Sequence, residues 1–210
     1  MINSGNLSLD KKNIDTVLVL DFGSQYTQLI ARRIRELNVF SVILPWDIAV
    51  EKIKSLNPKG VILSGGPESV TESNTPRIPQ VIFELDVPVL GICYGMQTLA
   101  EQFGGQVSSS KTKEFGHAQI TIEKASLLFD GFSSGSSVDV WMSHGDHVSR
   151  LPDEFHLIAA TPSAPIAAME HVEKPIYALQ FHPEVTHTKQ GVAVLENFIY
   201  KICKCSAQWK

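Results

Sequence analysis

Hydrophobic and polar positions alternate in blocks along the first half of the chain. After a polar stretch over residues 1–15, short apolar runs predict strands buried on both faces, at 16–22, 39–45, 60–66 and 88–92. The segments after these runs have helical spacing or helix-ending residues, which predicts helices at 25–38, 47–57, 76–86 and 94–105. Repeated strand–helix units indicate a parallel sheet with helices on both faces.

The pattern changes in the second half. Segments typical of strands follow one another with few helix candidates between them, at 117–124, 137–143, 155–162, 165–171 and 175–181. A loop is predicted at 133–137 and a closing helix at about 191–201. We therefore expect one α/β domain over 16–204, after a flexible leader at 1–15. Its mostly parallel central sheet is flanked by helices and continues into an antiparallel or mixed β extension.

Composition and charge narrow the function classes. The chain has 210 residues, 43% of them hydrophobic and 19% charged, as in a globular domain. A net charge of −4 with no basic cluster beyond "ARRIRE" argues against nucleic acid as a partner. No apolar run approaches the ~18 residues of a membrane span. An odd number of cysteines without a secretory signal indicates a reducing compartment. We predict a cytoplasmic protein that binds neither nucleic acid nor membranes.

Cys93 lies in the sequence "GICYG", between a predicted strand and a predicted helix. A nucleophile elbow has this form, because side chains two residues before and after the nucleophile would collide in so sharp a turn. The unpaired N–H groups at the start of the helix also favour a thiolate. The alternative is a packed core cysteine, which the flanking Gly91 and Gly95 disfavour.

His182 and Glu184 follow another predicted strand, in "QFHPEV". Pro183 holds His182 in an extended conformation, in which residues two apart point to the same side. Glu184 can then orient the imidazole while the other ring nitrogen faces a thiol. A surface turn is the alternative interpretation.

The glycines of "SGGPES" allow backbone amides to approach a ligand, as an oxyanion hole requires. The expected donors are the amides of Gly66 and Tyr94. A tight turn remains open, and a phosphate loop is disfavoured because no Gly-Lys-Ser/Thr ending follows. Cysteine, histidine, glutamate and oxyanion loop together indicate acyl transfer through a thioester.

The other histidines and cysteines receive weaker assignments. His144 and His147 in "SHGDH" suggest a metal, but no further ligands complete a set, so we expect none. Cys203 and Cys205 are expected to pack or to face solvent rather than to react.

The motifs around Cys93, His182 and Glu184 resemble those of the class I (triad) glutamine amidotransferases. Further stretches narrow the resemblance to the amidotransferase part of GMP synthases: "DFGSQYTQLIARRIRE", "SGGPESV", "EFGHAQ", "WMSHGD" and "QFHPEVTHT". The resemblance runs from about Val17 to Trp209. It implies the flavodoxin-like glutaminase fold of that family.

The resemblance also implies roles. Cys93 attacks the side-chain amide of glutamine, His182 protonates the departing ammonia and Glu184 orients His182. Gly66 and Tyr94 supply the oxyanion amides. The α-amino and carboxylate groups of glutamine are held by Gln97 with the backbone of Ser143, Gly145 and Asp146.

The resemblance implies a partner as well. In the family, ammonia passes to an ATP-pyrophosphatase (synthetase) domain that adenylates XMP and yields GMP. The Ser-Gly-Gly-Val-Asp-Ser phosphate loop of that domain is absent here. No cofactor is therefore expected in this chain, with ATP and Mg²⁺ confined to the synthetase domain. Residues 205–210 are interpreted as the start of a linker to it, which favours an excised domain over a stand-alone subunit.

Three other functions remain as alternatives: the glutaminase domain of another class I amidotransferase, a catalytically retired regulatory or binding module, and an α/β-hydrolase-like thiol hydrolase. The last is disfavoured because its triad runs nucleophile, acid, histidine, whereas here the histidine precedes the nearby acid. Because the synthetase half is missing, slow glutamine hydrolysis is expected from the isolated chain. By resemblance alone, residues 186–188 are the predicted surface for the synthetase half.

Overall fold

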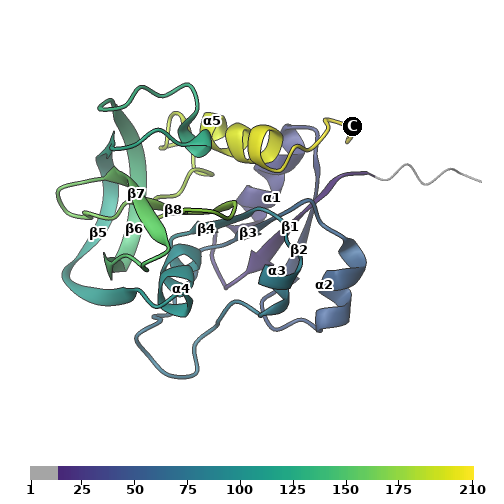
Figure 1. Cartoon of the computed structure of the whole chain (residues 1–210), viewed down its shortest axis with the longest axis horizontal. Helices are drawn as coiled ribbons and strands as arrows, with labels where there is room; N and C mark the ends of the chain where they lie inside the picture. The colour runs from purple at the N-terminus through teal and green to yellow at the C-terminus, as the bar shows by residue number, and fades with distance from the viewer. Residues whose placement is uncertain (1–13) are drawn as a thin grey trace, which may run out of the picture.

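A computed structural model of the chain describes residues 14–210, so almost all of the predicted leader lies outside the described residues. Within this range one sheet has the strand order β2-β1-β3-β4-β9-β8-β7-β5-β6 (Figure 1). The strands are β1 (Thr16–Asp21), β2 (Phe40–Pro45), β3 (Gly60–Leu63), β4 (Val89–Ile92), β5 (Gln106–Ile122), β6 (Ser137–Arg150), β7 (Phe155–Ala160), β8 (Ala168–His171) and β9 (Ile176–Leu179).

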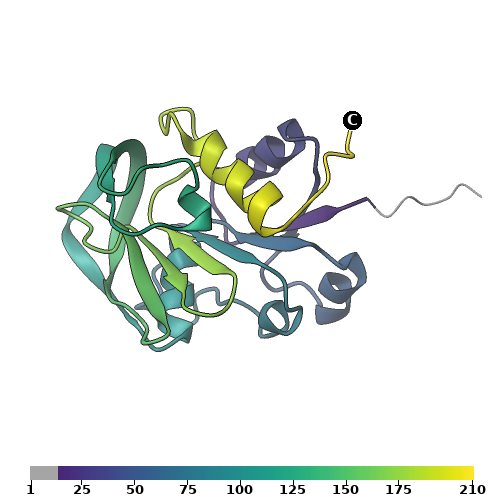
Figure 2. The same ribbon diagram turned by 45° about the horizontal axis from the view of Figure 1, so that its top comes forward.

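Helices cover both faces of the sheet. They are α1 (Thr27–Glu36), α2 (Val50–Leu56), α3 (Val81–Glu84), α4 (Tyr94–Gln102) and α5 (Gly191–Glu196), with a 3₁₀ turn η1 (Leu127–Phe129) and a π-helical continuation of α5, η2 (Asn197–Ile202). Helices α1 and α5 lie on one face, and α2, α3 and α4 lie on the other (Figure 1). Figure 2 shows α5 crossing its face of the sheet, with the β5–β6 pair at the far edge.

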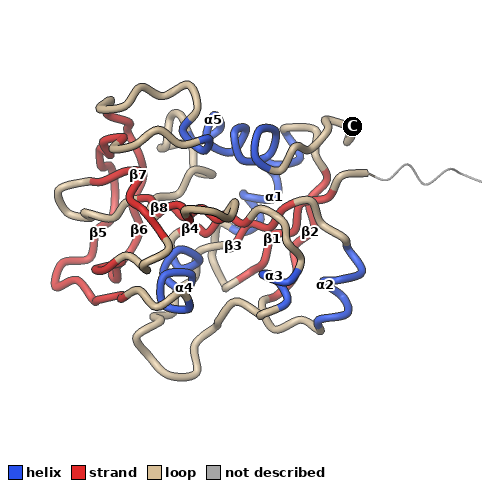
Figure 3. The backbone as a smooth tube through the Cα atoms, viewed as in Figure 1, coloured by secondary structure: helices blue, strands red, loops and turns tan. Residues whose placement is uncertain are grey.

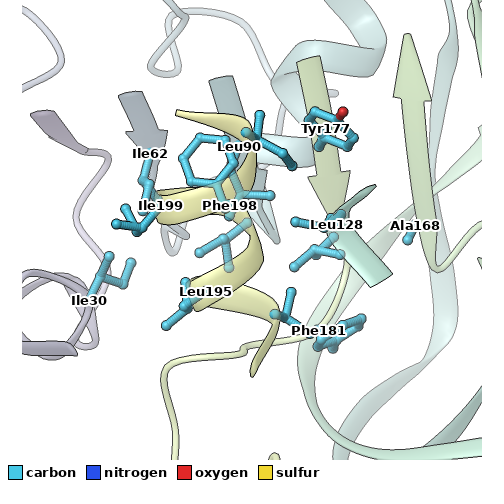
Figure 4. Packing of buried hydrophobic residues seen from close by; sticks show 14 of the residues in the cluster. Ile30, Ile62, Leu90, Leu128, Ala168, Tyr177, Phe181, Leu195, Phe198 and Ile199 are labelled. Carbon is cyan, nitrogen blue, oxygen red and sulfur yellow. The ribbon is translucent and has the colours of Figure 1, made fainter. Parts of the chain in front are cut away.

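The side chains of β1 contribute to two hydrophobic cores, one on each face of the sheet. Val17 and Val19 pack with α1 and α5, whereas Leu18 and Leu20 pack with α2, α3 and α4. Successive side chains of a strand point to opposite faces, so a continuous apolar run serves both cores. Figure 4 shows the first core, where Leu195, Phe198 and Ile199 lie against residues of the sheet and of α1.

The parallel half of the sheet sets the place of the candidate site. Strand β1 lies between β2 and β3, β3 pairs with β4, and β4 pairs with β9, all in parallel. Ile92 is the register partner of Leu179. The residues that follow β4 and β9 therefore meet at the same edge of the sheet. This half confirms the predicted parallel sheet.

The antiparallel extension is confirmed in kind, but its two main strands are much longer than predicted. β5 begins at Gln106 rather than 117, and β6 continues to Arg150 rather than 143 (Figure 3). The added residues are mostly polar and stand in a ribbon with little core beneath it. Their pairing depends on a backbone ladder between distant segments, so hydrophobic periodicity does not reveal it.

The helix predicted over 76–86 is wrong in extent, since only Val81–Glu84 is helical. Pro79 has no N–H to donate within a helix. The preceding loop is held from outside instead. The Gln102 side chain accepts a hydrogen bond from Ile78 N at 2.9 Å and donates one to Ile78 O at 3.0 Å.

Smaller differences concern helix and strand ends. Helix α4 ends at Gln102 and not at 105, as predicted. Two residues later Gly104 adopts φ +88°, a conformation suited to glycine after a helix end. The strand predicted from 165 begins at Ala168. Over residues 14–210, no helix is long and apolar enough to cross a membrane.

Candidate active site

Cys93 occupies the predicted elbow between β4 and α4. Its backbone has φ 52° and ψ −107°, a strained conformation for a residue with a side chain. The Cys93 N–H donates to Leu179 O at 2.7 Å, which fixes the turn against β9.

The two glycines of the elbow are required by close approach. A Cβ on Gly91 would lie 2.8 Å from the carbonyl of Gly95, and one on Gly95 would lie 2.5 Å from Leu63 O. Backbone atoms cannot move away as flexible side-chain ends can. The local sequence therefore enforces the turn that presents the Cys93 side chain.

His182 and Glu184 form a buried pair next to Cys93. His182 Nδ1 lies 2.7 Å from Glu184 Oε1, and the two residues are 3% and 0% exposed. The two side chains meet, as the i, i+2 interpretation of "HPE" predicts, but Pro183 and Glu184 lie in a turn and not in an extended segment. Because Nδ1 donates to the carboxylate, Nε2 is left for exchange of a proton with the sulfur.

The pKa of His182 reflects two opposing causes. Burial alone lowers it, but hydrogen bonds with Cys93 and Glu184, together with their charges, raise it well above its ordinary value of 6.5. The raised pKa favours the imidazolium form of His182 beside the sulfur of Cys93. Such a pair is what nucleophilic attack by sulfur and protonation of a leaving group require.

A hydroxyl in the loop after His182 ties the catalytic segment to β6. Thr188 Oγ1 accepts from Trp141 N at 3.0 Å and donates to His182 O at 2.6 Å. His182 N in turn donates to Trp141 O at 3.1 Å. These bonds bring β6 up to the elbow, where Cys93 Sγ donates to Ser143 O at 3.4 Å.

Two cavities meet at Cys93. One, of about 330 Å³, is lined by Gln97 and by the segment from Ser143 to Asp146. The other, of about 250 Å³, is lined by His182 and by residues 23–26. Gly66, Pro67, Cys93 and Ser143 line both. The two cavities are therefore adjacent at Cys93.

Of the two residues predicted for the oxyanion hole, Gly66 lines both cavities at Cys93, and Tyr94 follows Cys93 in the chain. Tyr94 is the first residue of α4, so its amide has no acceptor within the helix. The Tyr94 side chain points elsewhere, with its hydroxyl donating to Pro76 O.

All four residues predicted to bind the α-groups of glutamine line the larger cavity: Gln97, Ser143, Gly145 and Asp146. Gln97 Nε2 donates to Asp146 O at 3.0 Å, so these residues are joined before any ligand binds. The Asp146 side chain accepts a hydrogen bond from Ser69 Oγ. The structure brings this predicted set together, and its binding role stays a prediction.

Sequence reasoning missed two residues that organise the site. Gln180 Nε2 lies 3.6 Å from Cys93 Sγ. Gln180 is two residues before His182, so the i, i+2 rule used for His182 and Glu184 would have named it as a candidate. Ser64 is fully buried, and its hydroxyl accepts from Phe22 N at 2.9 Å. The Ser64 carbonyl accepts from Gly95 N, so Ser64 joins β1, β3 and α4. No local sequence pattern predicts this role.

The other singled-out residues lie away from Cys93 or serve structure. His156 contacts Glu170, and His117 contacts Asp139. His171 Nδ1 accepts from the amides of a turn, at residues 173 and 174. Cys203 and Cys205 are buried, in keeping with the packing prediction. Among residues 14–210, no cluster of three or more His, Cys, Asp or Glu side chains is arranged to hold a metal ion.

Comparison with known proteins decides the family. The family model "Glutamine amidotransferase class-I" matches residues 18–202. The chain belongs to the class I glutamine amidotransferases. This membership sets aside the α/β-hydrolase alternative.

Among its relatives, the chain is 55% identical over 199 residues to the GMP synthase [glutamine-hydrolyzing] of Pseudomonas fluorescens and 57% identical over 199 residues to that of Teredinibacter turnerae. Each match covers 92% of this chain but only 38% of the relative. The chain thus spans about two fifths of the length of the curated relatives it matches.

A solved structure matches over nearly its full length. It is a protein from Thermoplasma acidophilum, provisionally named as one of the subunits of a GMP synthase, with a TM-score of 0.80 and 34% identity. The match covers 91% of this chain and 94% of that one. The resemblance to the amidotransferase part of GMP synthases therefore holds in sequence and in fold.

Proposed function

We propose that this amidotransferase hydrolyses the side-chain amide of glutamine through a Cys93 thioester and supplies ammonia for the amination of XMP to GMP. The amination needs an ATP-dependent synthetase part, such as the GMP synthase relatives imply. ATP and Mg²⁺ would be used there, and this chain's own residues would carry only the glutaminase chemistry.

The reaction divides into two halves at Cys93. In the first, the thiolate attacks the amide carbon and the oxyanion that forms is held by the amides of Gly66 and Tyr94. The C–N bond then breaks as the His182 imidazolium gives its proton to the leaving nitrogen, which departs as ammonia. In the second, water gives a proton to His182 and attacks the thioester, which releases glutamate and restores the thiolate.

One observation supports this proposal above the others. His182 stands between Cys93 and a fully buried Glu184, and two cavities open on the sulfur. A retired binding module would have no need of a strained cysteine and a buried charge pair, both of which cost stability. We therefore favour turnover over the retired alternative.

The test is covalent labelling with 6-diazo-5-oxo-L-norleucine, an electrophilic glutamine analogue, followed by intact-mass and peptide analysis. One adduct is expected, at Cys93, slowed by L-glutamine but not by D-glutamine and lost in Cys93→Ser. A Cys203→Ser variant is the matched control and should label at the native rate. No adduct, or adducts spread over all three thiols, would refute the proposal.

The proposed link to a synthetase part is tested separately. Glutamate release is measured for this chain alone and with an added synthetase part from a GMP synthase, supplied with XMP and ATP. A slow rate alone and a faster one with the liganded partner are expected. A fast rate that the partner leaves unchanged would contradict the coupling, while labelling at Cys93 would still support glutamine hydrolysis.

A further inference from the structure

The β5–β6 ladder is interrupted beside the larger cavity. Ser109 pairs with Asp146 and Glu114 pairs with His144, so residues 110–113 of β5 stand opposite Gly145 alone. The regular register of the two strands is lost over this stretch. The interruption falls on the segment that lines the predicted glutamine pocket, so something must hold that segment in shape.

The His144 ring spans the interruption. Its Nδ1 lies 2.9 Å from Asp146 O, and its Nε2 lies 3.0 Å from Glu114 Oε2 in a charge contact that does not have the direction of a hydrogen bond. The His144 side chain is 4% exposed. Ser163 Oγ donates to the other Glu114 oxygen at 2.6 Å, which anchors the carboxylate from outside the two strands.

This chain of contacts ends at the substrate side. The Asp146 carbonyl that His144 contacts also accepts from Gln97 Nε2 at 3.0 Å. Glu114 itself does not line the larger cavity but a neighbouring one, of about 260 Å³. Its influence on a substrate must therefore pass through His144.

The number of protons on the His144 ring decides whether its contact with Glu114 is attractive or repulsive. A carbonyl oxygen can only accept, so Nδ1 of His144 carries a hydrogen. In a neutral ring, Nε2 would then present a lone pair to a carboxylate oxygen, and the two would repel. A second proton, on Nε2, would replace this repulsion with attraction between an imidazolium and a carboxylate 3.0 Å apart.

We propose that Glu114 is a positioning residue of the glutamine pocket, which holds the His144 ring through their charge contact and so fixes the Asp146 carbonyl and Gln97. The inference rests on the proposed function, since it concerns the same pocket. It assigns a role to the glutamate of "EFGHAQ" that lies outside the catalytic pair and the oxyanion amides.

The charged surroundings decide how firmly the proton is held. Burial lowers the pKa of His144, and the nearby charge of His147 lowers it further, whereas Asp146 O and Glu114 raise it. Lys113 on β5, Glu68 across the larger cavity and the Asp146 carboxylate are the other charged groups that line the cavities at the ring. Because burial dominates, His144 should lose its second proton as the pH rises, and the pocket should loosen.

The experiment measures Cys93 inactivation by 6-diazo-5-oxo-L-norleucine from pH 6 to pH 8, separating the half-saturating concentration KI from the maximal rate kinact. For Glu114→Ala we expect KI to rise about tenfold, as for loss of one charged contact, with kinact within about twofold of native. In the native chain KI should rise with pH. In Glu114→Gln, whose amide donates to a neutral Nε2, KI should stay near the native value at pH 6 and be flat with pH.

Asp139→Asn is the matched control, because Asp139 contacts His117 at the same 3.0 Å on the same two strands but in an exposed place. It should change neither KI nor its pH dependence. The ¹⁵N shifts of His144 give an independent readout of a protonated Nε2, and thermal melting checks that each variant folds.

The outcomes separate the two proposals. Absence of any Cys93 adduct in the native chain would overturn the proposed function, and this inference with it. Normal labelling with an unchanged KI in Glu114→Ala would overturn the inference alone. So would a native KI that is flat with pH, or an unprotonated Nε2 at pH 6.

Discussion

At the scale of single residues, the chemistry of this site depends on a histidine whose charge is set by its two partners. Hydrogen bonds to Cys93 and Glu184 outweigh the effect of burial and raise the pKa of His182. A group whose pKa is raised on folding stabilises the folded state fully below its unfolded pKa, ~6.5. That contribution is lost as the pH rises through the folded value.

Replacing Glu184 with Gln should remove most of this effect. The amide oxygen can still accept from Nδ1, but the negative charge is gone, so the pKa of His182 should fall toward its ordinary value. Inactivation of Cys93 should slow about a hundredfold. In urea unfolding, the native chain should lose more stability between pH 6 and pH 9 than Glu184→Gln does.

The control for this prediction is Glu173→Gln, an exposed glutamate on the turn before β9, which should behave like the native chain. Parallel pH profiles for the native chain and Glu184→Gln would show that Glu184 does not set the charge of His182.

At the scale of elements, the site forms where segments from different parts of the chain are fastened together. Strand β4 delivers Cys93, β9 delivers the segment of His182, and β6 delivers Ser143. The β4–β9 contact is a regular ladder. The contact between β6 and the segment after β9 combines two hydrogen bonds of the Thr188 hydroxyl with the bond from His182 N to Trp141 O.

Thr188→Val tests this fastening with almost no change in shape. The substitution leaves the Trp141 N–H and the His182 carbonyl without their partner. We expect unfolding to cost about 1–3 kcal/mol less than in the native chain, and Cys93 inactivation to slow because the His182 ring is less well held. Urea unfolding and the inactivation rate check the two effects.

Thr186→Val, two residues earlier and exposed, is the matched control and should change neither quantity. If the two variants proved equally stable and equally reactive, the Thr188 hydroxyl would not be what joins β6 to the catalytic segment.

At the scale of the whole molecule, the three cysteines occupy different environments in one fold. Cys93 opens on two cavities. Cys203 lies at the end of η2 against Gly60, so close that a Cβ on Gly60 would be 2.3 Å from its sulfur. Burial raises the pKa of the Cys203 thiol, whereas a hydrogen bond with Cys203 lowers the pKa of Cys205.

Alkylation with iodoacetamide should reflect these environments. In the native chain Cys93 should react first and Cys203 last, because Cys203 is both protonated and packed. In urea above the unfolding midpoint the three rates should converge. Peptide mass analysis over time measures each rate, and Cys93→Ser shows whether the fast phase belongs to Cys93. Equal native rates for Cys93 and Cys203 would contradict the described packing.

The fold and the site were predictable to different degrees. The strands of the parallel half are apolar runs that serve two cores, so hydrophobicity alone located them. The long ribbon of β5 and β6 was predicted only in part, because its polar residues gain stability from pairing with each other rather than from burial. The helix predicted at 76–86 forms only over Val81–Glu84. Pro79 has no N–H to donate within a helix, and the Gln102 side chain takes the hydrogen bonds of the Ile78 backbone.

The sequence by itself determined the local chemistry of this protein. Gly91 and Gly95 force the turn at Cys93, and the "HPE" turn brings His182 and Glu184 together, because both effects act within a few residues. Only the tertiary structure decided that β9 lies next to β4, that Ser143 and Gln180 reach the sulfur, and that Glu114 faces His144. Those contacts join residues far apart in the chain. Their energies come from strand pairing and from buried polar pairs, which produce no periodic pattern of hydrophobic residues in the sequence.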